Sequence, residues 1–125
     1  MSAEIKKLAF KSSGAVTSAA TTTTSWIDVG GFNEGYFWLD VTAFAARVDE
    51  TLVVTIEREV TGTATGYITI ATFTTVNSTG AQDEEKTLTA ATGLLGGRIR
   101  ARYVTAGTWS SKSITFSITG MVKKV

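Results

Sequence analysis

Apolar and polar side chains alternate with a period of two along much of this chain. The clearest run is Tyr36–Thr42, where Phe37, Leu39 and Val41 share one face and the intervening residues share the other. Successive side chains of a β-strand point to opposite faces of a sheet, so this spacing predicts a strand with one buried face. The same period in Thr51–Val60 predicts a second strand of this kind.

Further segments carry the same pattern over shorter or less regular stretches. They are Ile5–Lys11, Trp26–Val29, Tyr67–Thr75, Lys86–Thr89, Arg98–Tyr103 and Ser113–Val122. The Thr- and Ala-rich segment Val16–Ser25 is either a loose edge strand or a connector. Asn77–Gly80 and the acidic Asp83–Glu85 together predict an exposed polar loop. About eight short strands with no helical period between them predict an antiparallel β-sandwich with jelly-roll or Greek-key connections.

The size of the chain favours one domain. Its 125 residues are 43% apolar, which is enough for a continuous core. Residues 1–25 are interpreted as an N-terminal strand followed by an arm or connector, and residues 26–125 as the body of the sandwich. Lys and Arg total 12 against 11 for Asp and Glu, so the formal charge of +1 gives no general attraction to nucleic acid. No window reaches the roughly 20 continuous apolar residues of a membrane span.

The absence of His and Cys removes most catalytic chemistry. Ser-His-Asp triads, Cys-His pairs and metal centres held by His or Cys cannot be built. The triplet Ser110–Lys112 lies in a predicted hairpin, and carboxylates such as Asp40 on a sheet are typical of a solvated face. Asp49 and Glu50 lack the spacing of a calcium loop and are interpreted as turn charges. We therefore expect no enzymatic activity, no cofactor and no bound metal.

Three arginines form the most distinctive local pattern. Arg98, Arg100 and Arg102 alternate with apolar residues, so a strand places all three on one face. Glu57 and Glu59 have the same two-residue spacing and can pair with arginines on a neighbouring strand. The alternative is that these five residues form a docking surface for an acidic protein partner.

Aromatic residues offer a second type of contact. Exposed rings stack on the apolar faces of sugars, which makes a carbohydrate-binding module the alternative function. The candidate stacking residues are Trp26, Tyr36, Trp38, Tyr67 and Trp109.

Three segments are similar to strand pairs of small virion proteins from tailed bacteriophages. They are Leu52–Val60, Tyr67–Phe73 and Gly97–Trp109, set within a Thr-, Ala- and Gly-rich chain. In style the chain resembles head-decoration proteins, which cement a capsid from outside. This resemblance implies a non-enzymatic structural protein of the virion, made in the host cytoplasm, that contacts capsid proteins as a homo-oligomer such as a trimer.

The chain contains no proline, which commonly blocks unwanted pairing at the edge of a sheet. Edges without such protection favour assembly. If the resemblance holds, either the arm Met1–Ser25 or these edges contact the capsid shell.

Overall fold

The structure, a computed structural model, describes residues 4–45, 47–60, 66–89 and 95–124. Within these residues the regular secondary structure consists of β-strands. The strands are β1 (Glu4–Val16), β2 (Ala20–Thr23), β3 (Ile27–Asp28), β4 (Glu34–Ala45), β5 (Thr51–Glu59), β6 (Tyr67–Thr72), β7 (Gln82–Leu88), β8 (Arg98–Ala106) and β9 (Ser113–Lys124). The predicted all-β architecture is therefore confirmed.

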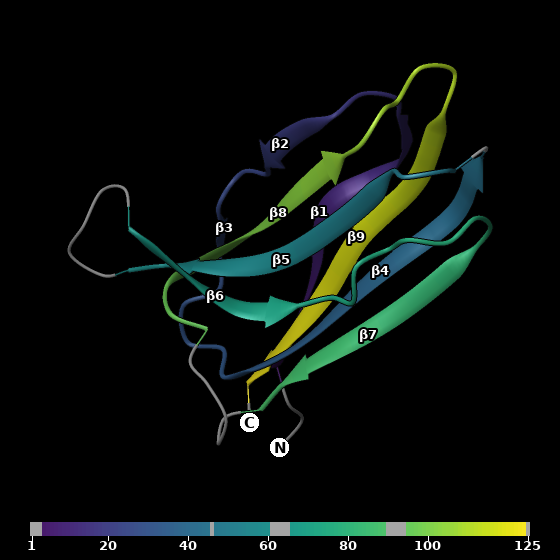
Figure 1. The fold of residues 1–125 in the computed structure, drawn as a ribbon. Helices are drawn as coiled ribbons and strands as arrows, with labels where there is room; N and C mark the ends of the chain where they lie inside the picture. The colour runs from purple at the N-terminus through teal and green to yellow at the C-terminus, as the bar shows by residue number, and fades with distance from the viewer. Residues whose placement is uncertain (1–3, 46, 61–65, 90–94, 125) are drawn as a thin grey trace.

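The strands form two antiparallel sheets that pack face to face (Figure 1). One sheet has the order β1-β9-β4-β7, which we call sheet A, and the other has the order β2-β8-β5-β6, with β3 also paired to β8, which we call sheet B. The first half of the chain thus pairs with the second half: β1 with β9, β2 and β3 with β8, β4 with β7, and β5 with β6. A two-stranded ribbon folded over itself in this way is a jelly roll.

The core lies between the two sheets and is built from alternate residues of the long strands. The predicted inward sets of β4, β5 and β9 are all buried, with exposed fractions of 2% or less. The largest fully buried apolar side chains are Phe37, Phe44, Phe73, Phe116, Leu52, Ile56, Leu95, Ile99, Ile114 and Ile118. Period-two patterning alone was sufficient to identify these faces because each side of a strand meets a single environment.

The prediction of a polar loop at Asp83–Glu85 is wrong. These residues belong to β7, which pairs with β4 in the register Trp38 to Glu85 and Asp40 to Asp83. Because β7 is the outer strand of sheet A, its side chains are half-buried or exposed over most of its length. A strand in this position needs no apolar face, so its sequence resembles a loop.

Residues 4–23 are part of the sandwich, since β1 pairs with β9 and β2 pairs with β8. The register of β1 shifts between Ala9 and Lys11 and again between Lys11 and Gly14. At this bulge the Lys11 ammonium donates hydrogen bonds to the backbone carbonyls of Gly14 at 3.2 Å and of Phe116 at 2.9 Å. Burial lowers the pKa of Lys11. The side chain therefore ties the distorted half of β1 to β9.

The interpretation of Glu50 as a solvated turn charge is also wrong. Glu50 is fully buried and accepts hydrogen bonds from the backbone N–H groups of Val48, at 3.0 Å, and Asp49, at 2.8 Å. It also forms an ion pair with Lys112, which precedes β9. Burial by itself would raise the pKa of Glu50, but Lys112 and the backbone donors outweigh burial and lower it to about 2. This carboxylate joins the turn before β5 to the turn before β9.

Candidate functional site

The arginine ladder runs along β8 on the outer face of sheet B. The strand register places Arg100 opposite Glu57 and Arg102 opposite Thr55 on the neighbouring strand β5. Arg100 Nε donates to Glu57 Oε1 at 3.0 Å, and Arg98 forms an ion pair with Glu59. Two of the three arginines are therefore paired within the chain, as the cross-strand alternative predicts.

The two ion pairs differ in burial. The Glu57 side chain is 1% exposed and that of Arg100 is 19% exposed, whereas the Arg98 side chain is 50% exposed. Glu57 Oε2 is buried and has no hydrogen-bond partner among the described residues. A buried carboxylate depends strongly on the cation that faces it, whereas an exposed ion pair contributes little to stability.

Aromatic rings contact two arginines of the ladder, Arg98 and Arg100, an arrangement that the sequence pattern did not predict. The Arg100 guanidinium carbon lies 4.2 Å from the ring centroid of Trp26 and 5.3 Å from that of Tyr67, and Arg98 lies 5.7 Å from Trp26. These are cation–π contacts. The available signal was the alternation in Trp26–Val29, which sets Trp26 on the side opposite to the apolar Ile27. The sequence does not show that Trp26 lies beside the arginines, because that position follows from the pairing of β3 with β8.

Arg102 is the member of the ladder without an ion pair among the described residues. Its strand neighbours are Thr55 on β5 and Thr23 on β2, neither of which carries a charge. The side chain is partly exposed. This face thus carries one positive charge that no acidic side chain of the described residues neutralises.

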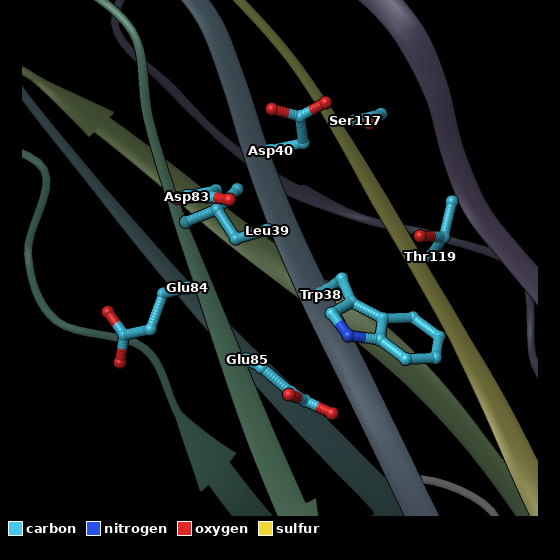
Figure 2. A pocket seen from close by; sticks show the side chains of 8 residues that line it. All are labelled: Trp38, Leu39, Asp40, Asp83, Glu84, Glu85, Ser117 and Thr119. Atoms are coloured by element: carbon cyan, nitrogen blue, oxygen red, sulfur yellow. The ribbon is translucent and has the colours of Figure 1, made fainter.

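A shallow depression lies on the outer face of sheet A. The core of the sandwich separates it from the arginine ladder on sheet B. The depression has a volume of about 530 Å³, and its lining comes from β4, β7 and β9 (Figure 2). Trp38 pairs with Glu85 and Thr119, while Asp40 pairs with Asp83 and Ser117. Asp40 lies directly opposite Asp83, and Glu85 also lines the depression, so this surface is acidic.

Glu84, which also lines this depression, has a structural role. Its carboxylate accepts hydrogen bonds from the backbone N–H of Thr74, at 3.0 Å, and from the Lys86 ammonium, at 2.9 Å. Partial burial would raise the pKa of Glu84, but the bonds from Lys86 and Thr74 outweigh it and lower the pKa. Glu84 therefore connects β7 to the segment that follows β6.

The structure separates the five aromatic candidates for sugar stacking. Trp109 is only 6% exposed and stacks on Phe44 with ring centroids 5.7 Å apart, so its ring belongs to the core. Trp26 and Tyr67 contact arginines, and Tyr67 is 46% exposed. Tyr36 and Trp38 are partly exposed on sheet A, where Trp38 lines the depression.

The remaining candidate catalytic and metal-binding residues do not come together in a site. Lys112 of the Ser110–Lys112 triplet is committed to Glu50, and Ser111 lies in a turn with a φ of 58°. Within the described ranges, no three acidic side chains lie close enough together to hold a metal ion. The same part of the chain contains no helix with the length and hydropathy of a membrane span.

Comparisons with solved structures show the fold. The structure of infectious bursal disease virus, Gx strain, matches with a TM-score of 0.61 and 15% sequence identity. The crystal structure of the VP2 subviral particle of the same virus matches with a TM-score of 0.59 and 14% identity. Both matches cover 97% of this chain and 32% of the other chain, so this chain spans about a third of the length of the proteins it matches.

The strand pairing defines the chain as a jelly-roll β-sandwich, and these matches show the same fold in the infectious bursal disease virus structures. No protein-family model matches the sequence, and no curated protein matches it. The matched structures come from infectious bursal disease virus and are not head-decoration proteins of tailed bacteriophages. What the chain shares with them is the fold.

Proposed function

We propose that this chain is a non-enzymatic structural protein of a virus particle that acts through protein–protein contacts. The observation that carries the proposal is the jelly-roll fold, which matches virus-particle structures over 97% of the chain. Jelly rolls also serve other functions, so the surface must agree with the assignment. Two features of the chain support the proposal. The chain has no His or Cys, which most catalytic sites use, and it has no proline to block pairing at its strand edges.

In its specific form, the proposal is that the chain decorates or cements a bacteriophage capsid as an oligomer such as a trimer. The proposed docking surface is the outer face of sheet B, with Arg98, Arg100 and Arg102 beside Glu57 and Glu59. Since Arg98 and Arg100 already have acidic partners, Arg102 is the residue available to an acidic capsid protein.

Particle binding tests this proposal. Particles purified from the virus that encodes the chain should contain it at a fixed ratio to the major capsid protein, measured by quantitative mass spectrometry. Its absence from such particles would contradict the virion role. Recombinant protein should also cosediment with particles that lack it, and Arg102→Ala should reduce the bound fraction while Lys124→Ala, a charge loss at the exposed end of β9, should not.

A second candidate function is carbohydrate binding, favoured by the position of Trp38 in an open depression with Ser117 and Thr119. An indole face can stack on a sugar ring while carboxylates and hydroxyls accept or donate hydrogen bonds. A glycan array, followed by titration of tryptophan fluorescence, tests it. Saturable binding that Trp38→Ala abolishes would support this function. A fluorescence change that persists in Trp38→Ala would contradict the assignment to this depression.

A further inference from the structure

The two outer strands of sheet A carry opposite charges. β1 forms one edge of the sheet and contains Lys6 and Lys7 in its regular half, whereas β7 forms the other edge and contains Asp83, Glu84 and Glu85. Lys7 and Asp83 are exposed, and neither forms an ion pair within the described residues. An outer strand presents backbone N–H and C=O groups that are unpaired on one side. Sheet A thus ends in a basic edge and an acidic edge.

Only part of β1 is suited to pairing with another strand. The register shifts and the Lys11 contacts distort the strand beyond Ala9, and bulges of this type prevent edge-to-edge pairing. The segment Glu4–Ala9 pairs with β9 without a register shift. It is close in length to β7, Gln82–Leu88, which also pairs with β4 without a shift. The regular part of each edge therefore matches the other.

The direction of the strands permits side-by-side assembly of copies. Each neighbouring pair in the order β1-β9-β4-β7 is antiparallel, so β1 and β7 run in opposite directions. A second copy in the same orientation, placed beside the first, brings its β1 next to the first copy's β7. The new pair is antiparallel and continues the alternation of sheet A.

The faces of the two strands restrict their register. On β1, Leu8 is buried and Lys7 is exposed, and on β7, Leu88 is buried and Asp83 is exposed. Outward residues must stay with outward residues, so the register can change only in steps of two. With Lys7 opposite Asp83, the opposite charges meet at three positions. The pairs are Lys7 with Asp83, Lys6 with Glu84, and Glu4 with Lys86. Glu84, Lys86 and Glu4 already form ion pairs within the chain, so Lys7 with Asp83 is the pair that joins two residues without an ion pair in the described ranges.

A slip of two residues weakens this complementarity in either direction: one slip keeps an opposite-charge pair, Lys7 with Glu85, but sets Lys6 against Lys86, and the other sets Glu4 against Glu84. Like charges directly opposite one another destabilise a pair of strands, and opposite charges stabilise it. We propose that β7 of one copy pairs with β1 of a second copy in the register that sets Asp83 opposite Lys7, extending sheet A from copy to copy.

This contact is heterologous, because each copy uses one edge to bind and the other to be bound. Such contacts produce closed rings when the rotation between copies closes and open filaments when it does not. The inference deepens the proposed function and rests on it in one respect, namely that copies of the chain assemble on a particle. It names the surface by which they would do so.

Sedimentation velocity of the purified chain tests the contact. The wild type should associate in a concentration-dependent manner, and 1 M salt should weaken association, because it shortens the screening length to about 3 Å. Lys7→Glu and Asp83→Lys should each weaken association at least about tenfold, which corresponds to about 1.4 kcal/mol. The double variant, carrying both changes, restores an opposite-charge pair and should recover association. Asp49→Lys, in the turn before β5, makes the same charge change as Asp83→Lys and should have no effect.

A wild type that stays monomeric overturns the inference, as does a double variant that associates no better than the single variants while retaining the fold. An equimolar mixture of the two single variants provides a second reading, since every junction in an alternating assembly then has opposite charges. Failure of the mixture to associate also overturns the inference. Particle binding by a monomeric variant would leave the virion role standing, whereas self-association without particle binding would remove the virion role and retain the contact.

Discussion

Replacing Arg100 with leucine removes the cation that faces a buried carboxylate. The Glu57 side chain is 1% exposed, and its Oε1 accepts from Arg100 Nε at 3.0 Å. Glu57 Oε2 has no alternative donor among the described residues. Removing one member of a buried ion pair leaves an uncompensated charge and costs about 3–5 kcal/mol. Arg98→Leu breaks a pair whose cation is 50% exposed, and exposed pairs contribute about 0–1 kcal/mol.

These values translate into a clear difference in thermal stability. Unfolding entropy scales with chain length, and for a chain of 125 residues about 1 kcal/mol corresponds to roughly 4 °C in Tm. Arg100→Leu should therefore lower Tm by roughly 10–20 °C. Arg98→Leu should lower it by no more than about 4 °C. Arg102→Leu, which breaks no ion pair, should have a small effect.

Differential scanning calorimetry of the three single variants measures this gradient along the ladder. The double variant Arg100→Leu/Glu57→Leu should recover most of the lost stability, because replacing both members of a buried pair with apolar residues is often neutral or better. Equal losses in Tm for all three arginines would refute the argument from burial. So would a double variant that is as unstable as Arg100→Leu alone.

Two further predictions concern stability. The pKa of Glu50 is about 2 in the folded protein, below its ordinary value of 4.5. The ionised carboxylate therefore stabilises the fold above about pH 4.5, and this contribution is lost as the pH falls toward 2. Glu50→Gln should unfold at lower urea concentration than the wild type at pH 7 and lose less stability across that acid range; an unchanged acid dependence would contradict this. In Gly120→Ala, the new Cβ would lie 2.8 Å from the Tyr36 carbonyl oxygen and 3.1 Å from the Phe37 ring, which should cost about 1–3 kcal/mol in urea unfolding. Gly97→Ala, with no atom within 4 Å of the new Cβ, is the matched control and should unfold like the wild type.

Local sequence pattern was sufficient for the strands that meet the core on one side. The runs Tyr36–Thr42 and Ser113–Val122 alternate in sequence, and their apolar residues are buried as predicted. The same rule placed the arginines of β8 on the outer face. Alternation is a property of neighbouring residues along one strand, and the core imposes it directly. The sequence was therefore enough to predict the fold class and the inward faces.

Positions that depend on distant partners could not be predicted in this way. Asp83–Glu85 resembles a loop but forms an edge strand, because β4 satisfies its backbone, solvent accommodates the charges of Asp83 and Glu85, and Lys86 pairs with Glu84. Glu50 resembles an exposed turn residue but is buried, because Lys112 meets it from the other half of the chain. In both cases the decisive contact joins segments far apart in sequence.

The candidate surfaces also depend on strand order, which the sequence pattern does not predict. The sequence determined that β1 is rich in lysine, that β7 is rich in carboxylates, and that the arginines of β8 share a face. Only the tertiary structure placed β1 and β7 at opposite edges of one sheet and separated Arg100, which pairs with the buried Glu57, from Arg102, which has no ion pair among the described residues. The physical reason is that charge and periodicity belong to each segment, whereas burial and edge position arise from long-range pairing between segments.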